Sequence, residues 1–156
     1  MNPKDIFLKE NIYFGEAVLA GVSCSVGYIK KFKWSWLATQ LNIFVFIGKT
    51  ELPVTRDLID GFSTACFNYA KANNKGWPRG IQSAVGSIAI LQANSVHDDA
   101  KIYGTGFMRK HWSAFEIPVI LDMQTKSSYR FLGKPLWGAI YFPFFEKTII
   151  DLTNQL

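Results

Sequence analysis

The sequence predicts one mixed α/β domain covering residues 1–156, with a mixed central sheet, an antiparallel hairpin and helices packed as cover. Hydrophobic residues make up 49% of the 156 residues and charged residues 19%, a balance typical of a chain that buries a core. Short apolar runs alternate with segments of helical spacing, an order typical of α/β folds. No repeat, low-complexity tract or linker divides the chain, so we expect a single domain.

The first thirty residues give the least regular pattern. Positions 3–22 mix apolar and charged residues at loosely helical spacing, although Gly15 and Gly21 weaken a helix. Residues 13–29 are mostly apolar, but Glu16 and several small residues leave too little continuous hydrophobicity for a transmembrane helix. The positive charges follow this stretch, which argues against a signal peptide. We therefore expect a cytoplasmic protein with no transmembrane segment.

The middle of the chain predicts two buried strands around an amphipathic helix. Residues 31–37 alternate aromatic with polar side chains, which predicts a strand with one wet face. Residues 41–47 form a nearly continuous apolar run, typical of a strand buried on both faces, and residues 85–91 predict another. Between them, Thr55 caps a predicted helix that ends near Asn73.

The C-terminal half predicts a short helix, a hairpin and a final helix. Ser95 and Asp98 have the spacing of a capping box and predict a helix that ends near residue 104. Residues 115–121 predict a strand in which Pro118 indicates a sheet edge or a bulge, and residues 129–132 return as its hairpin partner. Pro143 begins the last helix, which packs through Phe145, Ile149 and Leu152. In such sheets ligands bind beyond the carboxyl ends of the strands, here near residues 48–53 and 92–98.

The positive charge is unevenly distributed. The formal net charge is +5, yet four lysines and no acidic residue occur between positions 30 and 49. In residues 30–36 and 109–112 cations interleave with aromatic rings, a composition typical of single-stranded nucleic-acid binding or of docking at an anionic membrane surface. The alternative is a solvated strand edge whose tryptophans face the core. The loop at residues 76–80 places Trp77 and Arg79 between glycines, which suits a phosphate or carboxylate pocket or a plain turn.

The leading hypothesis is a non-catalytic binding domain that uses a basic and aromatic surface for an anionic ligand or a protein partner. Two cysteines, Cys24 and Cys66, and two histidines lie at scattered positions that predict no metal site, and both cysteines are expected to be reduced. No motif predicts a cofactor. The candidate ligand-binding residues are Trp77, Arg79, Arg109, Lys110, Trp112, Lys31 and Lys33.

Two alternative functions stay open. The first is a small metal-dependent hydrolase or nuclease that uses acids at a strand end, with Asp122 and Glu116 as catalytic candidates and Lys126 beside them. Asp122 can equally cap the hairpin turn. The second alternative is a self-associating structural protein whose surplus of aromatic residues forms a subunit interface.

Four short segments, residues 41–46, 78–83, 118–122 and 137–139, carry a resemblance that spans roughly positions 30 to 150. In them the chain resembles uncharacterised prokaryotic single-domain proteins of similar size. The resemblance implies a prokaryotic cytoplasm as the localisation, and it brings no activity, cofactor or site residue with it.

Overall fold

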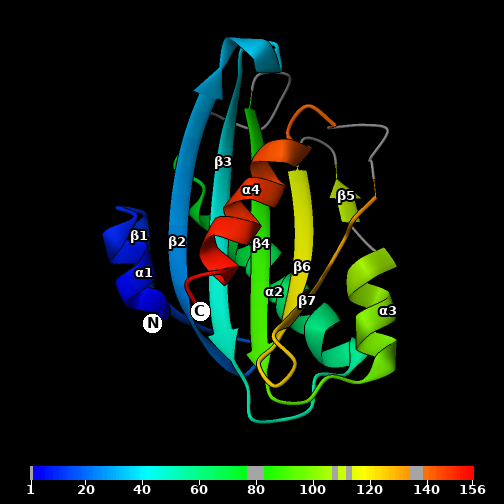
Figure 1. Ribbon diagram of the computed structural model, residues 1–156. Coiled ribbons are helices and arrows are strands. Elements are labelled where there is room, and N and C mark those ends of the chain that lie inside the picture. Colours follow the sequence, from blue (N-terminus) through cyan, green and yellow to red (C-terminus); the bar gives the residue numbers. More distant parts are fainter. Residues whose placement is uncertain (1, 77–82, 107–108, 112–113, 134–138) are drawn as a thin grey trace.

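The fold is a seven-stranded mixed sheet with helices on both faces (Figure 1). The structure is a computed structural model that describes residues 2–76, 83–106, 109–111, 114–133 and 139–156. The helices are α1 (Pro3–Lys9), α2 (Arg56–Asn73), α3 (Asp98–Gly106) and α4 (Phe142–Thr153). The strands are β1 (Tyr13–Leu19), β2 (Val22–Lys33), β3 (Thr39–Lys49), β4 (Ser83–Ala93), β5 (Arg109–His111), β6 (Ala114–Asp122) and β7 (Ser127–Arg130).

The strand order is β1-β2-β3-β4-β6-β5, and β7 also pairs with β6. The first three strands form an antiparallel meander, whereas β3, β4 and β6 are parallel and are joined by crossovers that contain α2 and α3. The short strands β5 and β7 pair antiparallel with β6. The prediction of a mixed α/β sheet with an antiparallel hairpin and helical cover is therefore confirmed.

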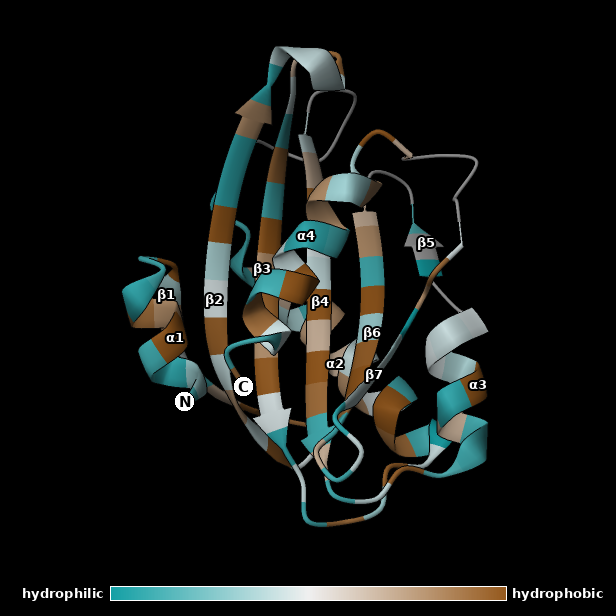
Figure 2. Cartoon of the chain, in the orientation of Figure 1, coloured by the Kyte–Doolittle hydropathy of each residue, from teal (hydrophilic) through white to brown (hydrophobic). Residues whose placement is uncertain are grey.

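The centre of the sheet is buried on both faces, as the apolar runs predicted. Every residue of β4 and β6, and all of β3 except its last residue, is buried. Figure 2 shows hydrophobic residues along much of these three strands. Because side chains alternate along a strand, Ile43 and Val45 pack with α1 and α4, while Phe44 and Phe46 pack with α2. Two apolar cores therefore lie on opposite sides of one sheet.

The predicted helices are confirmed with small differences at their ends. The Thr55 hydroxyl accepts a hydrogen bond from the N–H of Leu58 and caps α2, which ends at Asn73 as expected. Helix α4 has Pro143 in its first turn and buries Phe145, Ile149 and Leu152. Helix α3 begins at Asp98, so Ser95 precedes it and belongs to the loop that follows β4.

Pro118 lies at a gap along the outer edge of β6. Strand β5 pairs with β6 as far as Glu116, and β7 pairs with it from Val119 onward. Pro118 therefore falls between the two partners, where its missing N–H removes no ladder bond on that edge. No helix in the described parts of the chain is both long and apolar enough to cross a membrane.

The N-terminal region differs from the loosely helical pattern. Helix α1 is only seven residues long, and the chain then forms the β1–β2 hairpin. Its two-residue turn is Ala20-Gly21, with φ values of 48° and 78°, so both residues are left-handed as a type I′ turn requires. Gly21, which weakens a helix, is thus a turn residue, and Gly15 lies within β1.

The predicted strand over residues 31–37 is wrong beyond Lys33. Strand β2 ends there, and a 3-10 turn, η1 (Trp34–Trp36), leads to β3. A 3-10 turn does not keep the two-residue period of a strand, so Trp34 and Trp36 point to different surroundings. Trp36 is buried, with 4% of its surface exposed, whereas Trp34 is 81% exposed.

Candidate functional site

The turn between β2 and β3 presents an unusual group of exposed apolar side chains. It lies at the upper end of the sheet in Figure 1. Trp34 and Leu37 are 81% and 83% exposed, and Phe32 is 41% exposed and contacts Trp34 edge-on at a centroid distance of 5.4 Å. Three lysines lie on β2, with Lys31 and Lys33 on the face that α4 covers and Lys30 on the opposite face. We call this surface the basic–aromatic tip; its residues are Lys30, Lys31, Phe32, Lys33, Trp34 and Leu37.

Trp36 anchors the tip to the body of the domain. Its ring packs against Tyr141 and Phe144 of the α4 region, with centroid distances of 5.3 and 5.5 Å. The Lys33 ammonium group lies 4.9 Å from the centre of the same ring, a cation–π arrangement. One tryptophan of the motif is therefore a core residue, as the alternative interpretation expected, and the other is free to make contacts.

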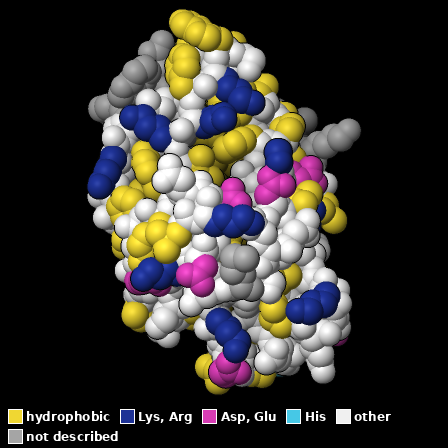
Figure 3. Space-filling view, turned by 60° about the vertical axis from the view of Figure 1, so that its left-hand side comes forward, with side chains coloured by type: hydrophobic (Ala, Val, Ile, Leu, Met, Phe, Trp, Pro, Cys, Tyr) yellow, Lys and Arg dark blue, Asp and Glu magenta, His cyan; other side chains and the backbone are white. Residues whose placement is uncertain are grey.

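The lysines of the tip have no acidic neighbours to neutralise them. The sequence contains no Asp or Glu between Glu16 and Glu51, so the whole β2–β3 hairpin lacks acids. Among the ion pairs of the described residues, none involves Lys30, Lys31 or Lys33. Figure 3 shows several Lys and Arg side chains on the upper half of one face, below a hydrophobic upper end, with Asp and Glu side chains nearer the middle.

The fourth lysine of the basic segment lies elsewhere. Because β2 and β3 are antiparallel, Lys33 pairs with Thr39 at the tip. Lys49 is the last residue of β3 and lies at the opposite end of that strand. Ten residues of strand separate Thr39 from Lys49, about 33 Å. Lys49 forms an ion pair with Glu51 at 2.8 Å. The tip therefore contains three of the four lysines that occur between positions 30 and 49.

Two residues of the turn have a left-handed backbone. Leu37 has φ 54° and ψ 41°, and Ala38 has φ 56°. A side chain with a Cβ atom is disfavoured in this region, where glycine and asparagine are the usual residues. Leu37 is therefore both exposed and conformationally strained, so neither burial nor backbone preference explains a leucine there.

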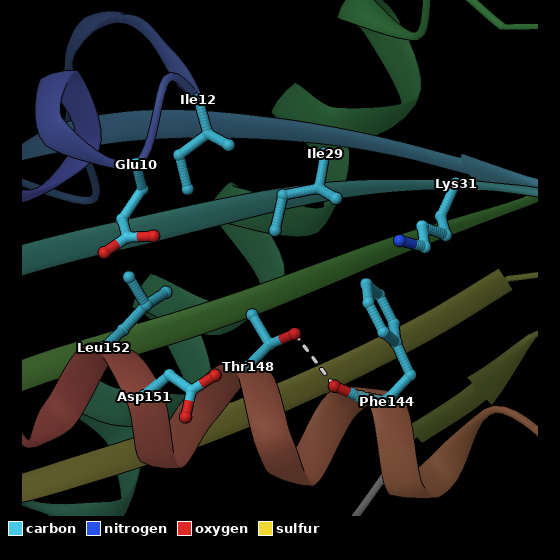
Figure 4. Close-up of a pocket in the computed structure, with 8 residues that line it drawn as sticks. All are labelled: Glu10, Ile12, Ile29, Lys31, Phe144, Thr148, Asp151 and Leu152. Atoms are coloured by element: carbon cyan, nitrogen blue, oxygen red, sulfur yellow. Dashed lines mark hydrogen bonds between the residues drawn. The ribbon is translucent and has the colours of Figure 1, made fainter.

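A groove of about 170 Å³ begins beside the tip and runs between β2 and α4 (Figure 4). Its apolar lining includes Ile12, Ile29 and Leu152. Figure 4 shows Lys31 at one end and the carboxylates of Glu10 and Asp151 at the other. The two acids have other partners, since Gln155 Nε2 donates to Glu10 Oε1 at 3.2 Å and Lys147 pairs with Asp151 at 2.5 Å. Among the described residues, neither acid forms an ion pair with Lys31.

A second polar group, the Glu116 cluster, lies between α2 and the β5 edge of the sheet. Glu116 is only 2% exposed and accepts hydrogen bonds at Oε1 from the hydroxyl groups of Ser63 (3.1 Å) and Thr64 (3.2 Å). Its Oε2 lies 3.1 Å from Nε2 of His111. The His111 ring stacks on Phe67 with a centroid distance of 4.3 Å. The buried carboxylate is thus held by groups from two elements, α2 and β5.

The outer part of the Glu116 cluster consists of Arg109, Asp60 and Tyr103. Arg109 Nη2 lies 2.9 Å from Asp60 Oδ1, and Arg109 Nη1 donates to the Thr64 hydroxyl at 3.1 Å. The Tyr103 hydroxyl donates to Asp60 Oδ1 at 2.6 Å. Burial, together with this hydrogen bond, raises the pKa of Tyr103. Two carboxylates therefore oppose one guanidinium and one imidazole, so the cluster offers no surplus positive charge to an anion.

The Glu116 cluster has the polar groups of an acid–base site but not their usual arrangement. A nucleophilic hydroxyl would need to face His111, yet Ser63 and Thr64 both donate to Glu116. Beside it, a cleft of about 440 Å³ separates α2 from α3 and is lined by Arg56, Asp99, Ile102, Tyr103 and Gly106.

The strand-end acids are not brought together. Glu116 and Asp122 lie six residues apart on β6, about 20 Å along the strand. Asp122 Oδ1 accepts hydrogen bonds from the N–H groups of Gln124 (2.9 Å) and Thr125 (3.1 Å). Burial raises the pKa of Asp122, but these hydrogen bonds outweigh it and lower the pKa below its ordinary value of 3.8. Lys126 has φ 56° in the same turn.

The loops at the carboxyl ends of β3 and β4 bond to each other. The Val54 N–H donates to Ser95 O at 2.9 Å, and the His97 N–H donates to Val54 O at 2.9 Å. The Thr50 N–H donates to Gln92 O at 3.0 Å. These backbone groups are therefore occupied at the edge where the strand order predicts a ligand.

The remaining candidates have mixed outcomes. Trp77, Arg79 and Trp112 lie outside the described residues, and Lys110 lies on β5. Arg109 belongs to the Glu116 cluster, while Lys31 and Lys33 belong to the tip. Sequence reasoning did not single out Leu37, Asp60 or Tyr103. Of these three residues, only Leu37 had a recognisable sequence signal, because it is an apolar residue next to a basic segment.

No group of three or more His, Cys, Asp or Glu side chains suited to a metal ion occurs within the described residues. Cys24 and Cys66 are free and buried, and burial raises the pKa of both thiols, that of Cys24 to about 12. The comparisons with known proteins find no matching family model, no matching curated protein and no matching solved structure.

Proposed function

We propose that this chain is a non-catalytic docking domain that binds an anionic partner through the basic–aromatic tip. One observation carries the proposal: Trp34 and Leu37 are 81% and 83% exposed on the turn that follows three lysines, and these lysines have no ion-pair partner among the described residues. Exposed apolar groups and unpaired like charges both oppose folding, so their coincidence is typical of a surface kept for binding.

The physical terms of such binding complement one another. Lys30, Lys31 and Lys33 repel one another in the free protein, and an anionic surface relieves that repulsion. They also attract an anionic partner over distances of about 10 Å, which speeds association at low salt. Burial of Trp34 and Leu37 then adds short-range apolar contact of about 1.5 to 3 kcal/mol for each side chain.

The catalytic alternative has less support. The carboxylate of Glu116 is enclosed by Ser63, Thr64 and His111, and Asp122 is used by the β6–β7 turn. The two acids are too far apart to bind one metal ion, since two ligands of one ion lie only a few ångströms apart. Their arrangement is that of structural carboxylates.

A prokaryotic cytoplasm is the location that we propose. Cysteines that stay free are typical of a reducing compartment, and Cys24 and Cys66 are both free and buried. The prokaryotic origin rests on the resemblance of the sequence. Anionic partners, among them nucleic acids, acidic proteins and acidic lipids, are abundant in that compartment.

Binding to immobilised heparin, a polyanion, tests the proposed function. We expect salt-dependent retention of the unaltered protein and strongly reduced retention of the triple variant Lys30→Gln, Lys31→Gln and Lys33→Gln. A matched control removes the same charge elsewhere with Lys4→Gln, Lys49→Gln and Lys126→Gln. Equal retention of the two triple variants would show that net charge, not the tip, governs binding, and the proposal would be abandoned.

A further inference from the structure

We infer that the anionic partner is the surface of an acidic phospholipid bilayer, into which Trp34 and Leu37 insert. This inference rests on the proposed function and names its partner. It concerns peripheral docking at the interface and not a membrane span.

The order of side chains at the tip matches the layers of a membrane interface. Trp34 and Leu37 lie in the turn itself, at the end of the sheet, and the lysines follow on the adjoining strand β2. In a bilayer interface, apolar side chains reach the acyl boundary, indole rings lie at the headgroups, and lysines contact lipid phosphates. The tip therefore presents each chemical type at the depth where an acidic bilayer accepts it.

The composition of the tip favours a bilayer over single-stranded nucleic acid. Nucleic-acid surfaces use several stacked rings and arginines, whose planar groups bind phosphate bidentately and stack on bases. The chain has no arginine before Arg56, and Leu37 cannot stack on a base. Phe32 already contacts Trp34 edge-on, which leaves one largely free ring. An aliphatic side chain beside a single indole fits an acyl boundary better.

The backbone of the turn supplies an independent argument. Leu37 keeps a bulky apolar side chain in a left-handed conformation that favours glycine, on a surface where it packs against little of its own chain. Backbone strain that persists on a protein surface is typical of functional positions. An apolar side chain that is exposed at the end of the domain is suited to contact an apolar environment outside the protein.

The tip is also rigid enough to insert without large ordering costs. The Trp36 ring packs against Tyr141 and Phe144, and ten residue pairs of the β2–β3 ladder lead up to the turn. A preorganised tip loses little conformational entropy on binding.

An environment-sensitive dye at the tip tests insertion directly. Ser35 is exposed between Trp34 and Trp36, so Ser35→Cys provides a labelling site. The native cysteines are buried with raised thiol pKa values, so they are poor competitors for the dye. Leu52→Cys, an exposed position in the loop that follows β3, gives the matched control label.

The labelled proteins are mixed with phosphatidylcholine vesicles that contain or lack phosphatidylglycerol, and binding is measured by co-flotation. We expect binding only to the acidic vesicles, with a blue shift and quenching by lipid-attached quenchers for the label at residue 35 and not for the label at residue 52. Trp34→Ala should weaken partitioning by roughly tenfold, because one large apolar side chain is lost. Replacing all three lysines of the tip by glutamine should weaken it by roughly a hundredfold, on the order of fivefold for each charge.

Four results would overturn the inference in distinguishable ways. Binding to acidic vesicles with no change at residue 35 and no effect of Trp34→Ala would exclude insertion. Retention on heparin or binding of oligonucleotides without vesicle binding would exclude the bilayer and leave the proposed function intact. Failure with every anionic probe would overturn both. Sedimentation as a dimer that Trp34→Ala converts to a monomer would assign the tip to self-association instead.

Discussion

His111 Nε2 lies 3.1 Å from Glu116 Oε2, although the antiparallel register pairs His111 with Ala114 and pairs Glu116 with Arg109. The two described polar side chains of β5, those of Arg109 and His111, thus lie near one carboxylate on β6, that of Glu116. Ser63 and Thr64 of α2 contact the same carboxylate from the helical layer. Glu116 is therefore the point at which the sheet edge and α2 are joined by polar contacts.

Glu116→Ala should destabilise the protein strongly. The substitution removes the carboxylate that the buried Ser63 hydroxyl and the partly buried Thr64 hydroxyl and His111 ring contact, which costs about 3 kcal/mol. Urea unfolding measures the change. The matched control is Glu51→Ala, because Glu51 and its ion-pair partner Lys49 are 75% and 59% exposed, so its loss should stay within about 0.5 kcal/mol. Equal effects of the two substitutions would contradict a structural role for the Glu116 cluster.

Two glycine-to-alanine substitutions should have opposite effects. A Cβ atom at Gly48 of β3 would lie 2.8 Å from Val22 Cγ1 and 3.2 Å from Phe62 Cζ, so Gly48→Ala should cost about 1 to 3 kcal/mol through overpacking. A Cβ atom at Gly61 of α2 meets nothing within 4 Å. Gly61→Ala should therefore stabilise the helix by about 0.5 to 1 kcal/mol. Thermal unfolding of both variants checks the signs, and a stabilising Gly48→Ala would contradict the packing between β2, β3 and α2.

Asp122→Ala should lower the free energy of unfolding by about 1 kcal/mol, because the β6–β7 turn loses the hydrogen bonds that the Asp122 side chain accepts. The substitution removes the acceptor of the Gln124 and Thr125 N–H groups, whereas Asp122→Asn keeps an acceptor oxygen and should retain most of the stability. The thermal midpoint is measured with and without Mg²⁺ and Mn²⁺. A midpoint that rises with metal in the unaltered protein and not in Asp122→Asn would support the metal-dependent alternative instead.

The central elements could be predicted because their signals are local. Residues 41–47 are apolar except for Asn42, which is typical of a strand between two layers, and the three- and four-residue spacing after Thr55 is that of a helix with one buried face. The β1–β2 hairpin could not be predicted in the same way. Its turn places Ala20 at φ 48°, a conformation that alanine rarely adopts, so the composition gave a weak turn signal.

The candidate sites were less predictable for two different reasons. The alternation of Trp34 and Trp36 is the same for a strand and for a short 3-10 turn, and only the backbone decides that one ring is buried and the other exposed. The Glu116 cluster joins residues that are distant in sequence, since Ser63 and Glu116 are 53 positions apart and Arg109 and Thr64 are 45 apart. Such contacts follow from strand order, which local patterns do not contain.

The buried thiol of Cys24 should make stability fall at alkaline pH. Burial, and then the charge of Glu16, raise the pKa of this thiol from 9.0 to about 12. The unfolded chain therefore loses the proton first, so the stabilisation is complete below pH 9 and declines as pH rises from 9 towards 12. Urea unfolding between pH 8 and pH 11 should show this decline, and Cys24→Ala should make it shallower because one ionising group is gone. Parallel curves for the two proteins would count against a buried, protonated thiol.

Leu37→Gly should raise stability while it weakens docking. The substitution relieves a left-handed backbone that costs a residue with a Cβ atom about 1 kcal/mol, and the exposed side chain contributes little packing in return. Leu37→Ala is the matched control, because it removes the same apolar surface but keeps the strain. We therefore expect a higher midpoint in urea for the glycine variant only, and similarly reduced binding to acidic vesicles for both. Equal stability of the two variants would show that the turn is unstrained, and a leucine there would then need no functional explanation.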